Sequence, residues 1–155
     1  MKKLKILGLI LVFNFSFSQN PEWINFTTGG NHINALAIEG DYIWVGTDGG
    51  GLVKLNMLTG EKVNYTKGSG LPSNYVLAIA IDGQGNKWIG TDGGLAKFDG
   101  VGWTVYKTSN SGLQSNYVSA IAIDGQGNKW IGTISGLAKF DGVNWTVYNT
   151  SSSSL

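Results

Sequence analysis

Few side chains in this sequence could do chemistry, and the most suggestive of them occur twice. The segment Asp82-Gly83-Gln84-Gly85-Asn86 returns unchanged at residues 124–128. A Ca²⁺ site needs about six or more oxygen ligands from several acidic or amide residues, and one aspartate with two glycines falls short of that. Asp, Asn and Gly are the usual residues of tight turns. The pattern therefore favours a hairpin turn, and we expect no metal site.

Catalytic residues are equally hard to find. His32 is the single histidine, so no histidine metal cluster or histidine–carboxylate pair repeats along the chain. It aligns with Tyr75 and Tyr117, which favours aromatic packing or binding in a loop over catalysis. Cysteine is absent, which removes zinc thiolate sites and disulfides. With no distinct acid, base or nucleophile, the sequence predicts a protein that is not an enzyme and has no cofactor.

A repeat of about 42 residues organises the whole sequence. Residues 74–106 and 116–148 are identical at 29 of 33 aligned positions. A more divergent copy spans residues 31–65, with one deletion between Ile38 and Trp44. A repeat period in this range indicates a repeat architecture, in which each unit needs its neighbours to bury its apolar face.

Each repeat alternates short apolar runs with glycine-rich turns. In the second repeat the runs are Val76–Ile81, Lys87–Thr91, Leu95–Phe98 and Trp103–Tyr106. None shows helical periodicity, and the connections are rich in residues that close tight turns. The sequence thus predicts an all-β chain in which every repeat is a four-stranded meander.

The first run of each repeat is apolar on both faces, which predicts a strand buried on both faces. We expect Val76, Ala78 and Ala80 to face one side and Leu77, Ile79 and Ile81 the other, so that small and branched side chains let neighbouring sheets interlock. Such repeats with recurring tryptophans are typical of β-propeller blades. The recurring tryptophans are Trp44, Trp88 and Trp130, expected between blades, together with Trp103 and Trp145.

The blades predicted here do not close a ring. Residues 23–26 match the fourth strand of a blade but have no first three strands of their own. Because propellers close with about four to eight blades, we expect residues 19–155 to be a partial propeller of three blades and one extra outer strand, belonging to a longer protein. The alternative is a short natural chain that completes its ring by oligomerising. The expected partners are accordingly further blades or another protein chain.

Residues 1–18 have the pattern of a secretory signal peptide. Three lysines precede the apolar run Ile6–Phe13, which is too short to span a bilayer, and Ser16-Phe17-Ser18 follows. We therefore expect export to the periplasm, the cell surface or the medium. The remaining chain has eight lysines, ten carboxylates and no arginine. With no concentrated basic face, a nucleic-acid partner is not expected.

The motif Leu71–Val76, followed by Asp82–Thr91 and Gly94–Asp99, resembles the two-component regulator propeller repeat. The resemblance extends from about Trp23 to Leu155. It implies the exported sensor region of a hybrid histidine kinase of Bacteroidetes-type bacteria, in which two seven-bladed propellers and a β-sandwich precede a membrane helix and a kinase. It also implies ligand sensing, often of oligosaccharides.

The same repeats occur in exported proteins without a kinase, including components associated with type IX secretion. The repeat therefore specifies fold better than role. The alternative function is a stand-alone secreted or cell-surface scaffold for protein contacts. No membrane-spanning segment, sandwich domain or kinase follows the propeller in these 155 residues, so signal output is not expected here.

One end of the blades collects the candidate ligand-binding residues. In an up-and-down blade, the loop leading into the first strand and the loop joining the second and third strands emerge on the same face. The residues so collected are His32, Asp48, Asn74, Tyr75, Asp92, Asn116 and Tyr117. Aromatic rings beside amides and carboxylates suit a sugar. Alternatively, the asparagines merely shape each turn, as their recurrence suggests.

Overall fold

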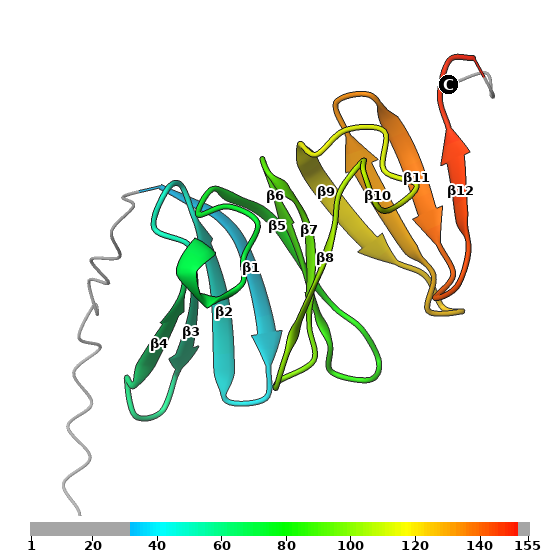
Figure 1. The fold of residues 1–155 in the computed structure, drawn as a ribbon. Coiled ribbons are helices and arrows are strands. Elements are labelled where there is room, and N and C mark those ends of the chain that lie inside the picture. Colours follow the sequence, from blue (N-terminus) through cyan, green and yellow to red (C-terminus); the bar gives the residue numbers. More distant parts are fainter. Residues whose placement is uncertain (1–31, 152–155) are drawn as a thin grey trace, which may run out of the picture.

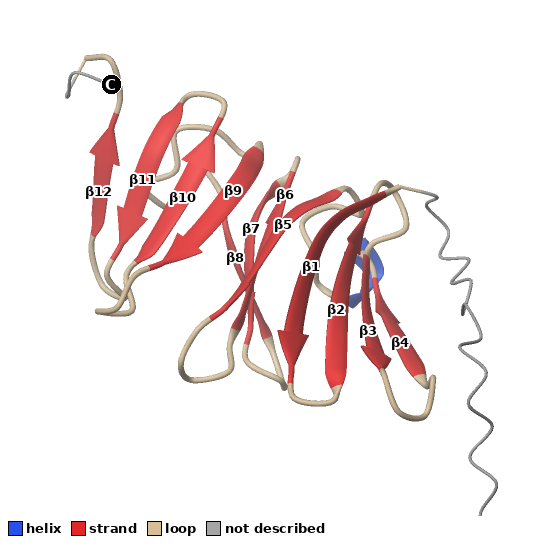
Figure 2. Ribbon diagram, turned by 180° about the vertical axis from the view of Figure 1, so that it is seen from behind, coloured by secondary structure: helices blue, strands red, loops and turns tan. Residues whose placement is uncertain are grey.

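The computed structural model describes residues 32–151, which form three four-stranded antiparallel sheets (Figures 1 and 2). Within each sheet the strands lie in sequence order. The innermost strands contact one another from sheet to sheet, so the three sheets stack in series as blades. The predicted all-β partial propeller of four-stranded blades is confirmed. The predicted signal peptide (residues 1–18) and extra outer strand (residues 23–26) lie outside the described residues.

The strands agree closely with the apolar runs of the sequence. The first blade consists of β1 (Ile33–Glu39), β2 (Tyr42–Thr47), β3 (Leu52–Asn56) and β4 (Lys62–Tyr65). The second consists of β5 (Val76–Ile81), β6 (Lys87–Thr91), β7 (Gly94–Phe98) and β8 (Trp103–Tyr106). The third consists of β9 (Val118–Ile123), β10 (Lys129–Thr133), β11 (Gly136–Phe140) and β12 (Trp145–Tyr148). A short 3₁₀ turn, η1 (Lys67–Ser69), lies between the first two blades.

Neighbouring blades interlock where a glycine of one sheet meets a valine of the next. A Cβ added to Gly46 would lie 2.6 Å from Cγ1 of Val76. A Cβ added to Gly90 would lie 2.8 Å from Cγ1 of Val118. These separations are shorter than real Cβ contacts, so the close approach of the sheets requires glycine at both positions.

The predicted alternation along the first strand of each blade is wrong for its first residue. Val76 faces Gly46 of the first blade, whereas Ala78 lies beside Gly90 at the junction with the third blade. The cause is a register shift between Val76 and Ala78 in the pairing of β5 with β6. A β-bulge inserts one extra residue and so reverses the side on which the preceding side chain lies.

The hydrophobic core lies between the blades, in two equivalent clusters. The buried members of the first are Trp44, Leu52, Leu71, Val76, Ile89, Ala96 and Phe98. The buried members of the second are Trp88, Leu95, Leu113, Val118, Ile131, Ala138 and Phe140. Each cluster draws residues from two adjacent sheets, so no blade completes its core alone.

The two end sheets expose the faces that blade junctions bury elsewhere. On the first blade, Leu36 and Ile38 are 58% and 68% exposed. On the third blade, Ala120 and Ala122 are exposed and Trp130 is only half-buried. Residues 32–151 therefore form an open series of blades.

No helix within residues 32–151 is both long and apolar enough to cross a membrane.

Candidate functional site

The predicted ligand-binding residues gather at one end of the blades, which we call the upper end after its position in Figure 1. Asp48 follows β2 and Asp92 follows β6, while Tyr75 and Tyr117 precede β5 and β9. The opposite, lower end carries the turns that join the first strand of each blade to the second and the third to the fourth.

Backbone contacts join the loops of the first two blades at the upper end. The N–H of Gly51 donates to the carbonyl oxygen of Asn74 over 2.9 Å. The ring of Tyr75 lies against Gly49, since a Cβ there would be 3.8 Å from it. The N–H of Asp48 donates to the carbonyl oxygen of His32 over 2.9 Å. The structure thus brings His32 beside Asp48, and Tyr75 beside the turn that carries Asp48.

Tyr75 and Tyr117 present their rings to solvent at equivalent places in successive blades. Tyr75 is 49% exposed and Tyr117 is 39% exposed. Asp92 is also exposed, and its backbone N–H donates to the carbonyl oxygen of Tyr75 over 3.3 Å. In the third blade Ile134, 72% exposed, stands where Asp92 stands in the second. The two tyrosines therefore have different neighbours.

The side-chain oxygens of Asn74 and Asn116 are engaged within the chain. Oδ1 of Asn74 accepts the backbone N–H of Lys67 over 2.7 Å, and Oδ1 of Asn116 accepts that of Thr108 over 2.9 Å. Each bond ties the loop that leaves one blade to the segment that leads into the next. Of the predicted residues, the tyrosines, the aspartates and His32 are exposed, whereas the two asparagines are half-buried.

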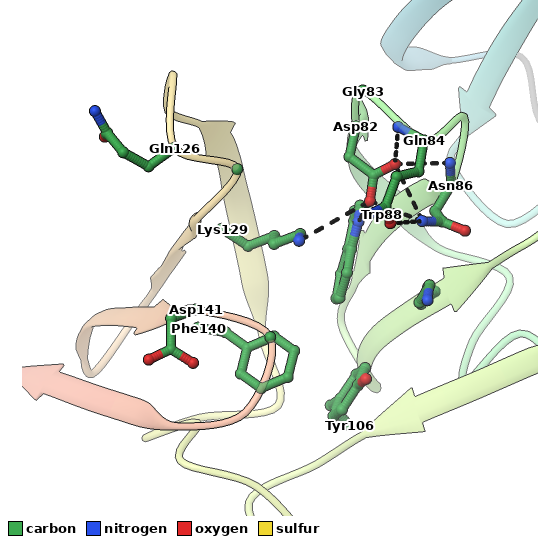
Figure 3. Close-up of a pocket in the computed structure, with 13 residues that line it drawn as sticks. Asp82, Gly83, Gln84, Asn86, Trp88, Tyr106, Gln126, Lys129, Phe140 and Asp141 are labelled. Carbon is green, nitrogen blue, oxygen red and sulfur yellow. Dashed lines mark hydrogen bonds and ion pairs between the residues drawn. The ribbon is translucent and has the colours of Figure 1, made fainter.

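A cavity of about 420 Å³ opens at the lower end, between the second and third blades (Figure 3). Its lining includes the turns after β5, β9 and β11 and side chains from β6, β8 and β10. Trp88 stacks on Tyr106 with ring centroids 5.9 Å apart, and Tyr106 lies 5.6 Å from Phe140. The sequence alone places no candidate site here.

Asp82 is the most heavily bonded side chain of this cavity. Its Oδ1 accepts the backbone N–H groups of Gln84 and Asn86 over 3.0 and 2.9 Å. Its Oδ2 accepts the indole N–H of Trp88 over 2.9 Å and the side-chain amide of Asn86 over 2.9 Å. The carboxylate closes the turn and fixes the tryptophan, which is the role of a structural residue.

Hydrogen bonding keeps these carboxylates ionised. Burial raises the pKa of Asp82, but the hydrogen bonds from Trp88 and Asn86 together lower it by more than burial raises it. The pKa of Asp82 therefore lies below its ordinary value. In the third blade, bonds from Asn128 and then Trp130 lower the pKa of Asp124 to about 2. An acceptor-saturated carboxylate of this kind is poorly placed to act as a general base.

The pH dependence of stability follows from these shifts. Because the folded-state pKa values of Asp82 and Asp124 lie below the ordinary value of 3.8, their stabilisation is present above pH 3.8 and is lost as the pH falls through the lowered pKa values, which for Asp124 is about 2. We expect the thermal midpoint to fall steeply across this window. Calorimetry at stepped pH checks it. The double variant Asp82→Asn/Asp124→Asn should have a lower thermal midpoint at neutral pH, and its thermal midpoint should change less with pH below 3.8. An unchanged dependence of the thermal midpoint on pH in this range would contradict the assignment.

One chemical feature at the lower end repeats from blade to blade. The Nζ of Lys129, from the third blade, lies 3.9 Å from Oδ2 of Asp82 and 5.0 Å from the ring centroid of Trp88. Figure 3 shows this lysine reaching across the junction. The sequence contains a signal for this contact, namely an acid followed five residues later by lysine and then tryptophan. This pattern occurs at residues 82, 87 and 88 and again at residues 124, 129 and 130. The lysine's partner belongs to another repeat, so the spacing alone does not disclose the contact.

Within residues 32–151 no cluster of three or more His, Asp or Glu side chains could hold a metal ion.

Four-stranded antiparallel sheets stacked through buried tryptophans define this protein as a β-propeller chain. The family model described as the two component regulator propeller matches residues 70–93 and 112–135. These segments run from the loops before β5 and β9 to the turns after β6 and β10. These two segments thus match the repeat that the resemblance predicts. A comparison with curated protein sequences finds no match.

Several solved structures share the fold. The extracellular domain of a hybrid two component system from B. thetaiotaomicron is 23% identical, with a TM-score of 0.69 over 81% of this chain and 18% of that one. PorZ, a surface component of the type-IX secretion system of Porphyromonas gingivalis, is 23% identical, with a TM-score of 0.60 over 73% of this chain and 18% of that one. A virginiamycin B lyase from Staphylococcus aureus is 15% identical, with a TM-score of 0.65 over 81% of this chain and 44% of that one. At these identities the likeness establishes the fold.

The chain spans 18% of the length of each of the first two structures.

Proposed function

We propose that this chain is part of a non-catalytic recognition propeller in the extracytoplasmic sensor region of a two-component system. The observation that carries the proposal is the match of two segments to the two component regulator propeller. The similar fold of the extracellular domain of a hybrid two component system supports it. The proposal includes export to the periplasm or cell surface, for which the pattern of residues 1–18 is the support.

The proposed binding surface is the upper end, around Tyr75 and Tyr117. Both rings are partly exposed, and Asp48 and Asp92 present exposed carboxylates nearby. A sugar offers an apolar ring face for stacking and hydroxyl groups that donate to carboxylates. We propose a small extracellular ligand of this class, an oligosaccharide.

The absence of catalysis in the proposal rests on how the carboxylates are used. Asp82 and its counterpart Asp124 hold turns and indole N–H groups. His32 is the only histidine in the sequence and lies at the upper end, away from these aspartates. Among residues 32–151, these contacts bring no acid, base and nucleophile together.

Binding of oligosaccharides tests the proposal. In a glycan-array screen followed by calorimetric titration of each hit, Tyr75→Ala and Tyr117→Ala should each weaken affinity about tenfold or more, because each removes a stacking ring. Tyr42→Ala, at the β1–β2 turn of the lower end, is the matched control and should leave affinity unchanged. Retention of full affinity in both upper-end variants would refute this site.

A scaffold for protein contacts is the second candidate. The exposed apolar face of the first blade favours it, since Leu36 and Ile38 are mostly uncovered. The reading frame beyond Leu155 separates the two functions: further blades, a membrane helix and a kinase would support the sensor, and a secretion-sorting domain would support the scaffold.

A further inference from the structure

Each junction between blades contains the same three-residue contact at the lower end. At the first junction, Glu39 accepts the indole N–H of Trp44 over 2.9 Å and pairs with Nζ of Lys87 over 2.9 Å. At the second junction, Asp82 accepts the indole N–H of Trp88 over 2.9 Å and lies 3.9 Å from Nζ of Lys129. The acid and tryptophan come from one blade and the lysine from the next.

The lysine is buried by this arrangement. The side chains of Lys87 and Lys129 are only 7% and 12% exposed. Each Nζ lies 5.0 Å from the centroid of the tryptophan ring across the junction. Because an unpaired charge is costly to bury, a lysine at this position requires a facing acid and tryptophan.

The third blade presents the acid and tryptophan without a lysine from a following blade; Lys139 of the same blade lies 5.5 Å from the ring centroid of Trp130, as Lys54 does from that of Trp44. Asp124 accepts the indole N–H of Trp130 over 2.9 Å, as in the other blades. No lysine within residues 32–151 forms an ion pair with Asp124. The surrounding sheet face is open, with Ala120 and Ala122 exposed. It has the small side chains and the acceptor that the two internal junctions use.

The first blade lacks the complementary lysine. In the register of the sheets, Lys87 of β6 lies opposite Ile81 of β5, and Lys129 of β10 lies opposite Ile123 of β9. The residue at that register position in the first blade is Ile43, which pairs with Ile38. A second copy that docked its first blade on the third blade would place isoleucine opposite Asp124 and bury the carboxylate with its hydrogen bonds but without a counter-charge.

We infer that the open face of the third blade, defined by Ala120, Ala122, Asp124 and Trp130, docks a further propeller blade that carries lysine at the register position of Lys87 and Lys129. The first blade of a second copy is not its partner. The lysine thus determines which blade can dock on this face, because only a blade with lysine at that position supplies the counter-charge for the aspartate. Its effect adds to that of apolar packing.

An engineered second copy tests this selection with the full chain. The donor variant Ile43→Lys/Asp124→Asn carries the lysine on its first blade and lacks the acid on its third blade. It can therefore dock its first blade on the third blade of another molecule, but its own third blade cannot accept a lysine. Mixed with the unmodified chain, it should form a one-to-one complex. Mixed with the acceptor variant Asp124→Asn, it should bind about tenfold or more weakly, because the lysine loses its counter-charge.

Sedimentation equilibrium gives both dissociation constants, and circular dichroism with thermal melting confirms that each variant is folded. The unmodified chain alone should associate more weakly than the matched mixture. Equal dissociation constants for the two acceptors would overturn the inference. So would self-association of the unmodified chain as tight as the mixture, or no association in any mixture, which would mean that another segment covers this face.

Discussion

Replacement of Trp88 by alanine is expected to lower the free energy of unfolding by about 3–5 kcal/mol. The side chain is 2% exposed and lies between the second and third blades, against Tyr106 and Phe140. Its loss would leave a large cavity and remove the indole N–H that Asp82 accepts. Urea denaturation followed by circular dichroism measures the change.

Trp130 is the matched control for Trp88. It has the same neighbours in sequence and the same bond to its aspartate, Asp124, but it lies on the open face of the third blade and is only half-buried. Trp130→Ala should therefore cost about 1–2 kcal/mol, since less apolar area is lost from the interior. Equal losses for the two variants would mean that the junction between blades does not bury Trp88 as described.

The second large effect is expected from a single added methyl group. Gly90→Ala would place a Cβ 2.8 Å from both Cγ1 and the carbonyl oxygen of Val118. Because the third blade must shift to admit it, we expect a loss of about 1–3 kcal/mol from overpacking. The shift in thermal midpoint by calorimetry provides the measurement.

Gly132 tests whether that effect comes from the neighbouring blade. It occupies the same place in the third blade, where an added Cβ would meet Ala120 of its own blade at 3.2 Å. Gly132→Ala should change stability by no more than about 0.5 kcal/mol. If Gly132→Ala lowered the stability as much as Gly90→Ala, the effect would come from the strand that carries the glycine and not from the neighbouring blade.

The strands and their grouping into blades could be predicted because each repeat is locally consistent. Apolar runs of four to six residues are separated by Gly, Asn and Asp, which leaves little choice of where a strand ends. The predicted runs Val76–Ile81, Lys87–Thr91 and Trp103–Tyr106 coincide with β5, β6 and β8, and β7 begins one residue before the run Leu95–Phe98.

The side on which Val76 packs could not be predicted by alternation alone. The bulge between Val76 and Ala78 has no strong local signal, because both residues and the intervening Leu77 are apolar. Its consequence appears only when the next blade is in place, since Val76 then fills the space over Gly46.

The sequence placed the candidate ligand-binding residues at one end of the blades but could not foresee the contacts of the lower end. Lys87 and Glu39 are 48 residues apart and belong to different repeats. Their pairing depends on how two sheets stack, which periodicity within one repeat does not specify. The turn formed by Asp82 and Asn86 was predictable, but its bond to Trp88 links it to the core.

Proximity across the two junctions tests the central claim most directly. In nuclear Overhauser spectra of the dilute chain, methyl protons of Val76 should show cross-peaks to the α-protons of Gly46, and those of Val118 to the α-protons of Gly90, because these groups meet where adjacent blades stack. Gly132 should show no such cross-peak to a valine of another blade. Absence of the first two contacts, or a contact joining Gly132 to the first blade within one molecule, would contradict an open series of stacked blades.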